Sequence, residues 1–259
     1  MELLNINKEN KISNKTKDQS IMVEVDKLSK SFGEKVVLKD FTMKLIKGEN
    51  LVILGKSGSG KSVFIKLLVR LLDYDKGCIK ILDKDVAQLN QHDLNILRQK
   101  IGFLFQSAAL YDSMSVKENL EFPMRVLKDV TAEEKEKLVK ETLSNVGLAD
   151  AINKKPSELS GGMRKRIGLA RTLILKPEII LYDEPTTGLD PITSKEISKL
   201  ILEMQKKYNT TSIIITHDMD CAKITSNRVI ILKDGAVGAE GTFDELSKSE
   251  DAFVHSFFE

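Results

Sequence analysis

Residues 51–62 constrain the fold of this chain more than any other stretch. Leu51–Leu54 is a short, continuous apolar run, which is typical of a strand buried on both faces of a parallel sheet. The next eight residues fit the pattern G-x-x-x-x-G-K-[ST], in which glycines let the backbone wind tightly so that successive N–H groups converge on a phosphate. We expect a helix to begin at about Lys61 and to add its positive N-terminal end beneath the same anion. The predicted phosphate-binding residues are Gly55, Lys56, Ser57, Gly58, Ser59, Gly60, Lys61 and Ser62.

Two side chains at the end of this motif have separate predicted roles. Lys61 is placed to reach the β- and γ-phosphates of a nucleotide, and the Ser62 hydroxyl is placed to bind Mg²⁺. A glycine-rich turn without a ligand is the alternative, but a strand before the pattern and a helix after it are the context in which the pattern binds phosphate. The motif therefore predicts a nucleotide-binding protein.

Composition excludes several other classes of protein. The chain has 259 residues, enough for a substantial core, and 41% of them are hydrophobic while 30% are charged. The net charge of +2 gives no overall signal for nucleic acid, and no apolar stretch approaches the roughly 20 residues of a membrane-spanning helix. The N-terminus lacks the apolar core of a secretory signal, and Cys78 and Cys221 match no metal-ligand spacing. We therefore expect a cytosolic protein.

The pattern along the chain predicts one α/β domain between two tails. Residues 1–20 are rich in Asn, Lys and Ser and are expected to form a flexible tail. Strands are expected from Met22, over 36–46, 78–82, 101–105, 178–182, 211–215 and 228–232, and the helix after the phosphate-binding motif over 63–72. Thr131 and Glu134 form a capping box for a helix that Gly147 would end, within a mainly helical insertion. Alternation of strands and helices predicts a parallel sheet with helices on its faces.

A second chemical motif lies at the end of the apolar strand predicted at 178–182. Asp183 and Glu184 follow this strand directly, and ligands of a parallel α/β sheet gather at the carboxyl ends of its strands. Asp183 is therefore predicted to help hold the Mg²⁺ ion, as a Walker-B aspartate does, and Glu184 to polarise an attacking water as general base.

The segment Leu159–Met163 makes the prediction more specific. It reads Leu-Ser-Gly-Gly-Met before a predicted helix, and here the sequence resembles the ATPase cassettes of ABC transporters, whose signature motif is usually LSGGQ. Ser160 suits a helix N-cap, and the two glycines leave the N–H groups of the helix start accessible to phosphate. The resemblance implies that Ser160, Gly161 and Gly162 face the γ-phosphate held by a second subunit, so that two ATP molecules are enclosed in a head-to-tail homodimer.

Other positions match the same family one by one. Gln106 stands where the family's Q-loop glutamine contacts Mg²⁺ and the attacking water, and His217 where its switch histidine contacts the γ-phosphate. Asp190 ends a Gly-Leu-Asp string like the D-loop between the two active sites, and Phe32 stands where an aromatic ring stacks on adenine. The resemblance thus implies ATP and Mg²⁺ as cofactors. The implied metal ligands are Ser62, Gln106 and Asp183, and the implied catalytic residues are Glu184, His217 and Gln106.

The resemblance also implies a fold: an α/β P-loop NTPase with a RecA-like parallel sheet core, an ABC-type antiparallel β subdomain and a helical subdomain. We expect the ATPase domain over residues 21–248, its helical subdomain over about 107–160, and a C-terminal tail helix over 249–259. The phenylalanines of that tail, Phe253, Phe257 and Phe258, are expected to pack on their own domain or to contact a partner subunit.

Two classes of protein use such a cassette, membrane transporters and ATPases that act on nucleic acid or ribosomes. Only 99 positions separate Lys61 from Ser160, without sustained heptads, which excludes the coiled-coil insertion of the repair and chromosome ATPases, and the chain has one cassette where the translation type has two. The basic run Arg164–Arg166 favours nucleic acid at first sight but is interpreted as the solvated face of the signature helix. Transport is the better interpretation. It implies separate integral membrane permease subunits, a peripheral location at the cytoplasmic face of the inner membrane and no direct nucleic-acid partner.

Three local strings point to a subfamily. Residues 102–111, the signature ending in Met163, and residues 183–193 together look like the ATPase subunit of phospholipid transporters of the Mla type, which work with Mce-domain proteins and accessory subunits. An importer of another solute is the alternative. Residues 107–114, after Gln106, are expected either to dock a permease or to pack into the helical subdomain, and the sequence does not decide between the two.

Overall fold

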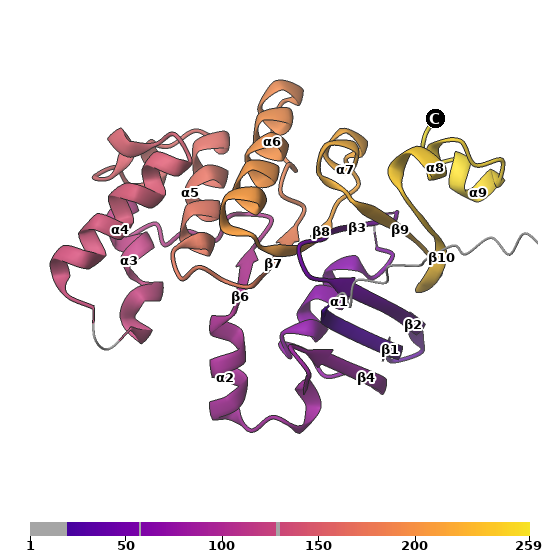
Figure 1. The fold of residues 1–259 in the computed structure, drawn as a ribbon. Coiled ribbons are helices and arrows are strands. Elements are labelled where there is room, and N and C mark those ends of the chain that lie inside the picture. The colour runs from indigo at the N-terminus through magenta and orange to yellow at the C-terminus, as the bar shows by residue number, and fades with distance from the viewer. Residues whose placement is uncertain (1–19, 57, 128–129) are drawn as a thin grey trace, which may run out of the picture.

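The computed structural model describes residues 20–56, 58–127 and 130–259 (Figure 1). The predicted phosphate-binding residue Ser57 and the tail predicted over residues 1–20, except its last residue, lie outside this part of the chain. Within it, a six-stranded sheet has the order β10-β9-β3-β8-β7-β6, and a four-stranded antiparallel sheet has the order β2-β1-β4-β5. The ten strands are β1 Ile21–Phe32, β2 Lys35–Ile46, β3 Asn50–Leu54, β4 Lys76–Ile81, β5 Lys84–Asp85, β6 Ile101–Leu104, β7 Ile179–Asp183, β8 Thr211–Ile215, β9 Arg228–Lys233 and β10 Ala236–Gly241.

Helices cover both faces of the larger sheet, in which every pair of neighbours is parallel except β9 and β10. The predicted parallel core sheet and the predicted antiparallel sheet are both confirmed. The α-helices are α1 Lys61–Leu68, α2 Gln91–Gln99, α3 Val116–Glu121, α4 Ala132–Asn145, α5 Gly161–Leu173, α6 Pro191–Tyr208, α7 Met219–Thr225, α8 Phe243–Ser247 and α9 Ala252–His255. Short 3₁₀ helices are η1 Val86–Gln88, η2 Pro123–Val126, η3 Ala149–Ala151 and η4 Pro156–Glu158.

The alternation of side chains along the parallel strands divides the interior into two cores. Val52, Ile180 and Ile214 face the core that also contains α5, α6 and α7, whereas their neighbours Ile53 and Leu181 face the core formed with α1 and the antiparallel sheet. Because successive residues of a strand point to opposite faces, a strand covered on both sides must be apolar throughout. This explains why these strands were recognisable as continuous apolar runs.

Between the P-loop (residues 55–62) and the signature motif, the longest helix, α4, begins directly after Thr131, as the capping box predicted. The Thr131 hydroxyl accepts a hydrogen bond from the Glu134 N–H at 3.2 Å, and the Glu134 carboxylate accepts one from the Thr131 N–H at 2.8 Å. α4 ends at Asn145, and Gly147 follows with φ of +70°. In Figure 1, α3, α4 and α5 lie together at one end of the molecule, beside α6.

Element boundaries differ from the predictions where distant residues intervene. The helix after the P-loop was predicted to reach residue 72, but α1 ends at Leu68 and Arg70 adopts a φ of +52°. The guanidinium of Arg98 donates to the carbonyls of Val69 at 3.0 Å and Arg70 at 3.1 Å, so that carbonyls beyond the helix end find their partner on α2. The strand predicted to end at residue 105 stops at Leu104, and β7 begins one residue later than predicted, at Ile179.

The predicted C-terminal helix is shorter than expected, because α9 comprises only four residues. Phe253 lies on this helix, while Phe257 and Phe258 lie in the turn that follows. All three pack against the core on the α6 and α7 side of the sheet, and the rings of Phe258 and Phe243 meet edge to face at 5.3 Å between centroids. In the structure, this aromatic cluster packs on its own domain.

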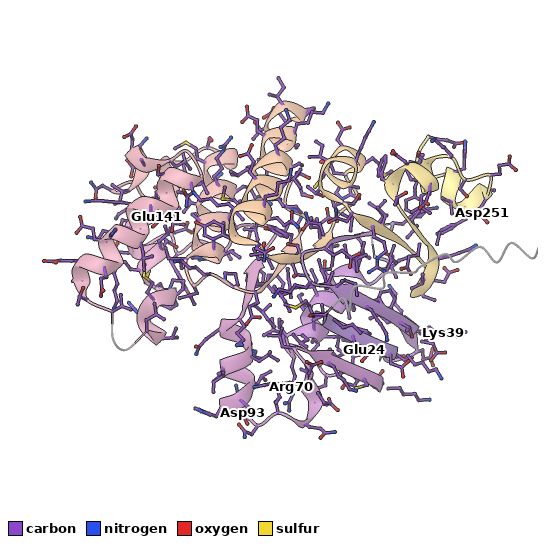
Figure 2. The ribbon with its side chains drawn as sticks, in the orientation of Figure 1. Glu24, Lys39, Arg70, Asp93, Glu141 and Asp251 are labelled. Atoms are coloured by element: carbon purple, nitrogen blue, oxygen red, sulfur yellow. The ribbon has the colours of Figure 1, made fainter. Side chains whose placement is uncertain are left out.

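Charged side chains are exposed on several elements. Figure 2 shows labelled charged side chains, such as Glu141 on α4 and Asp251 before α9, at the outer edge of the molecule. In the part of the chain that the structure describes, no helix combines the length and the apolar character needed to span a membrane.

Candidate nucleotide-binding and catalytic site

The P-loop joins β3 to α1, and α1 begins at Lys61 as predicted. Gly60 precedes the helix with φ of +98°, and a β carbon there would lie 2.8 Å from the Val37 carbonyl oxygen, so that only glycine fits. Among the described residues, no side chain caps this helix, and its first turn has no acidic residue. The free N–H groups and the positive end of α1 therefore face the loop, as an anion site requires.

Lys61 is buried within this loop. Its Nζ donates to the carbonyls of Gly55 at 2.7 Å and Lys56 at 3.2 Å, and lies 3.9 Å from Oε1 of Glu184. Burial lowers the pKa of the Lys61 ammonium, while the carboxylates of Glu184 and Asp183 act in the opposite direction. A buried ammonium that has lost its water is further stabilised by an arriving phosphate.

Ser62 and Asp183 meet at the carboxyl end of β7. The Ser62 hydroxyl donates to Oδ1 of Asp183 at 3.0 Å, and burial raises the pKa of the Asp183 carboxyl. A buried carboxylate beside a hydroxyl is an oxygen donor set of the kind that Mg²⁺ prefers, so these residues fit the predicted ion. Among the described residues, no three His, Cys, Asp or Glu side chains form a complete metal site. An ion here would therefore take its remaining ligands from phosphate, water and Gln106.

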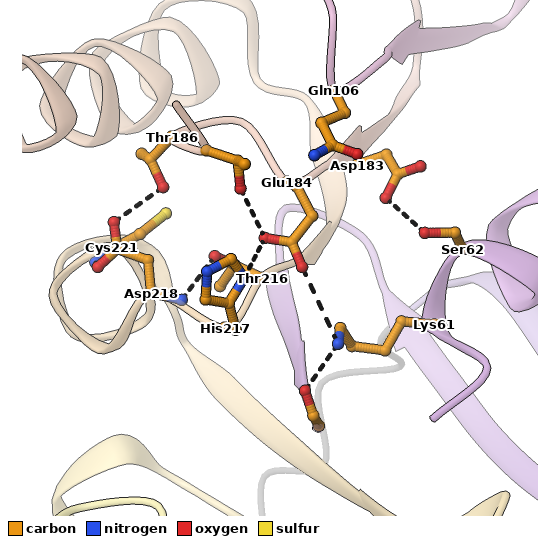
Figure 3. A network of polar contacts seen from close by, with 12 residues as sticks. Lys61, Ser62, Gln106, Asp183, Glu184, Thr186, Thr216, His217, Asp218 and Cys221 are labelled. Carbon is orange, nitrogen blue, oxygen red and sulfur yellow. Dashed lines mark hydrogen bonds and ion pairs between the residues drawn. The ribbon is translucent and has the colours of Figure 1, made fainter. Parts of the chain in front are cut away.

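Glu184 directly follows β7 and connects three elements. Oε2 lies 2.8 Å from Nδ1 of His217 and accepts a hydrogen bond from the Thr187 hydroxyl at 3.2 Å, while Oε1 faces Lys61 (Figure 3). The backbone N–H of Glu184 donates to the Ile215 carbonyl at 2.9 Å, and its φ of +51° is a left-handed conformation that residues with a β carbon rarely adopt. The carboxylate is thereby aimed back toward the P-loop.

One cleft brings together eight of the residues that the sequence predicted. It has a volume of about 640 Å³, and Phe32 lies at it with 48% of its surface exposed, with the Lys30 ammonium 5.2 Å from the ring centroid. A ring so exposed can stack on a nucleotide base, so its predicted role is sterically open. The lining residues are Phe32, Lys35, Val37, Gly58, Gly60, Lys61, Ser62, Val63, Gln106, Glu184, Thr187 and His217.

Seven predicted nucleotide-binding residues that the structure describes do not line this cleft: Gly55, Lys56 and Ser59 of the P-loop, and Ser160, Gly161, Gly162 and Asp190. Ser160 caps α5 through the Met163 N–H at 3.2 Å, and Asp190 caps α6 through the N–H groups of Ile192 and Thr193 at 3.1 and 3.0 Å. Gly161 lines a separate groove with Gly188 and Leu189, and a β carbon on Gly162 would lie 2.7 Å from the Thr193 side chain. The starts of α5 and α6 therefore lie side by side, and Ser160–Gly162 and Asp190 do not line the phosphate-binding cleft of their own chain.

Comparison with known proteins identifies the family. The ABC transporter family model matches residues 38–187, more than half of the chain. The chain belongs to the ABC transporter family. The "Probable ribonucleotide transport ATP-binding protein mkl" of Mycobacterium tuberculosis is 38% identical over 237 residues, which cover 92% of this chain and 66% of that protein. This chain thus spans about two thirds of the length of that relative.

Two further relatives extend the comparison. The chloroplastic Protein TRIGALACTOSYLDIACYLGLYCEROL 3 of Arabidopsis thaliana is 37% identical over 256 residues, covering 93% of this chain and 74% of that protein. The solved ATP-binding cassette MJ0796, captured as a dimer with ADP and Pi, superimposes with a TM-score of 0.78 at 33% identity, over 86% of this chain and 99% of the other. The predicted ABC cassette fold is therefore confirmed, and the chain is an ATP-binding cassette of the ABC transporter family.

The cassette contains one site residue that the sequence analysis misjudged. The run Arg164–Arg166 was interpreted as a solvated face, but Lys165 is only 5% exposed, and its Nζ donates to the carbonyls of Gln106 at 2.5 Å and Glu184 at 3.1 Å. Burial lowers the pKa of Lys165 to about 8. Lys165 shares a second buried face of α5 with Leu169 and Thr172, at spacings of four and three residues, and this spacing was the signal that could have identified it.

The rest of the basic run only partly fits the solvated interpretation. Arg164 is exposed, as predicted. Arg166, with a quarter of its side chain exposed, pairs with Glu196 of α6 at 2.9 Å and donates to the Val146 carbonyl at 3.3 Å. The run therefore offers one free cation, not the three that a nucleic-acid patch would use.

Proposed function

We propose that this chain is the ATP-hydrolysing subunit of a transporter whose permease is formed by separate chains, and that it acts as a homodimer at the cytoplasmic face of the inner membrane. The observation that carries the proposal is the division of the predicted site. The P-loop, Glu184 and His217 share one cleft, whereas Ser160–Gly162 and Asp190 lie outside it. A site divided in this way is completed when a second copy brings its signature helix to the phosphates.

In the proposed reaction, the residues neutralise charge and align a water. Lys61 and the start of α1 bind the β- and γ-phosphates, and Ser62, Asp183 and Gln106 hold Mg²⁺, which when bound supplies further neutralising charge on the phosphate oxygens. Glu184 accepts the proton of the attacking water, because its carboxylate opens into the same cleft. His217, bonded to Oε2, orients that carboxylate and contacts the γ-phosphate.

For the transported molecule we propose phospholipid, with Mce-domain and accessory subunits as partners. The strings at 102–111 and 183–193 and the signature ending in Met163 support this class, and the Arabidopsis relative, which is named for a glycolipid, supports the broader class of lipid transport. Import of another solute is the second candidate, and the mycobacterial relative, named for ribonucleotide transport, favours a solute that is not a lipid. An action on nucleic acid has lost its main support, because Lys165 is buried and Arg166 is paired.

The catalytic part of the proposal is tested by Glu184→Gln. We expect ATP turnover to fall by roughly 10²–10⁴-fold while fluorescent ATP binds with unchanged affinity, because the amide keeps the size of the side chain but cannot accept the proton. Glu178→Gln, an exposed glutamate one residue before β7, is the matched control and should turn over ATP within about twofold of the wild type. Near-normal turnover by the Glu184 variant would remove Glu184 from the role of base.

The transport class is tested by isolating the protein with its partners. We expect the tagged chain, extracted from membranes in mild detergent, to bring a permease and an Mce-domain protein with bound phospholipid. A solute-binding importer in their place would refute the phospholipid class, and ribosomes would refute transport.

A further inference from the structure

Lys165 is one of three charged side chains that the described part of the chain buries to more than nine-tenths. The other two are Lys61 and Asp183, both predicted from the sequence as site residues. Charged groups are almost never buried to this extent unless they are paired, because removal from water disfavours the charged form. Because Lys165 lies between Gln106 and Glu184, we expect it to act in the same site.

We propose that Lys165 is a positioning residue that sets the distance between Gln106 and Glu184 and connects both to the start of the signature helix. The proposal deepens the proposed function and rests on it, since it assumes that Gln106 and Glu184 act on the Mg²⁺ ion and the water.

The two carbonyls that Lys165 binds follow neighbouring strands. β6 and β7 pair in parallel up to Leu104 and Tyr182, and the chain leaves the sheet just beyond this point on both strands. Beyond this point, hydrogen bonds between β6 and β7 no longer fix the distance between the two backbone segments that follow these strands. The Lys165 ammonium donates to the Gln106 carbonyl at 2.5 Å and to the Glu184 carbonyl at 3.1 Å. These charge-assisted bonds connect the two segments where the hydrogen bonds of the sheet have ended.

The backbone of Glu184 needs such a restraint. Its φ of +51° is disfavoured for a residue with a β carbon, so bonds on both sides of the residue must hold it. The N–H is held by the Ile215 carbonyl at 2.9 Å, and the carbonyl by Lys165 and, more weakly, by the Thr187 N–H at 3.3 Å. Without the Lys165 ammonium, the peptide after Glu184 can rotate, and the carboxylate would leave the cleft.

The Gln106 side of the contact is held from the same helix. Ala108 and Ala109 also have positive φ values, +60° and +47°, and Arg171 donates to their carbonyls at 2.9 and 2.7 Å. α5 thus grips the segment after β6 with two cations two turns apart. α5 begins at Ser160–Gly162. If the phosphate of a nucleotide bound to a second copy displaced this end of the helix, Gln106 and Glu184 would move together.

The experiment compares Lys165→Met with Lys165→Arg in the complete chain. Methionine keeps the length of the side chain but removes every donor, so we expect kcat to fall by about 10–100-fold while the dissociation constant for fluorescent ATP changes by less than threefold. Arginine retains the charge and the donors and should recover kcat to within about fivefold of the wild type. Lys199→Met, an exposed lysine on α6, is the control for loss of a helix lysine and should leave kcat unchanged.

A double variant separates this proposal from the proposed function. If Lys165 acts through Glu184, adding Lys165→Met to Glu184→Gln should lower turnover by less than threefold further, since the group being positioned is already lost. Full additivity of the two losses would overturn the proposal even with Glu184 confirmed as base. An unchanged kcat in folded Lys165→Met would also overturn it, and so would equal losses of kcat and ATP binding that follow the loss of folded protein, measured by circular dichroism.

Discussion

Asn119 holds the segment that follows Gln106 from the inside. The side chain lies on α3 and is fully buried. Its Oδ1 accepts a hydrogen bond from the Tyr111 N–H at 2.8 Å, and its Nδ2 faces the carbonyls of Tyr111, Met114 and Ser115 at 3.1, 3.2 and 3.0 Å. An amide nitrogen has two hydrogens, so at most two of these carbonyls are satisfied at once and the side chain makes about three bonds in total.

The substitution Asn119→Leu is expected to destabilise the fold by about 2–3 kcal/mol. Three neutral hydrogen bonds contribute about 0.5–1.5 kcal/mol each. Part of this loss of stability is offset, because leucine has no side-chain amide that must give up its water on folding. For a domain of this size the loss corresponds to a decrease in Tm of about 5–10 °C. The loop 107–115 should also exchange its amide hydrogens faster, the Tyr111 amide most of all.

Thermal melts followed by circular dichroism and hydrogen–deuterium exchange measure the two effects. Asn95→Leu is the matched control, because Asn95 is exposed on α2 and, within the residues that the structure describes, its side chain bonds only to its helix neighbours Gln91 and Arg98. Its Tm should stay within about 2 °C of the wild type. A Tm of Asn119→Leu within the same limit, with unchanged exchange at Tyr111, would refute the idea that this amide organises the segment.

The remaining predictions concern an ion-pair cluster and the two cysteines. Arg228 donates to both carboxylate oxygens of Glu49 at 2.7 and 2.9 Å and also pairs with Glu240, so Arg228→Ala should lose about 2 kcal/mol of stability, and a melting temperature lowered by less than about 1 °C would contradict this. Burial raises the pKa of the Cys221 thiol to about 11, so that it stays protonated at pH 8. We therefore expect a disulfide reagent to label only the partly exposed Cys78 in the native protein and both thiols in urea, whereas rapid native labelling of two thiols would contradict the structure.

Local chemistry made part of this structure predictable. β3, β7 and β8 are runs of apolar residues because each is covered on both faces, and α4 begins at Thr131 because Thr131 and Glu134 satisfy the first N–H groups of the helix by themselves. The P-loop was recognisable for a similar reason, since the tight turn at Gly60 requires glycine. In each case the sequence signal that predicts the element lies within a few neighbouring residues.

The features that escaped prediction depend on partners distant in the sequence. α1 ends at Leu68 beside carbonyls that Arg98 of α2 satisfies, and Lys165 is buried because its partners are the carbonyls of Gln106 and Glu184. In the sequence Lys165 stands between two arginines and resembles them. Asn119 is equally hard to recognise in the sequence, because its side chain bonds to the backbone of a loop that lies over it only in the folded chain. The site could therefore be located from the sequence, but not the contacts that hold it in shape.

The charges buried at the site give an independent reason to expect a second copy. Lys61 and Lys165 approach Glu184 from two helices, and together with Asp183 they form a group of two cations and two carboxylates that is balanced without a nucleotide. ATP with its Mg²⁺ ion would add a net charge of about −2, of which the start of α1 offsets about half a unit. Exposed groups such as Lys35 at the mouth of the cleft are screened by water and offset less. The positive N-terminal end of a second signature helix would supply positive potential where the γ-phosphate remains uncompensated, so that nucleotide binding itself would favour closure of the dimer.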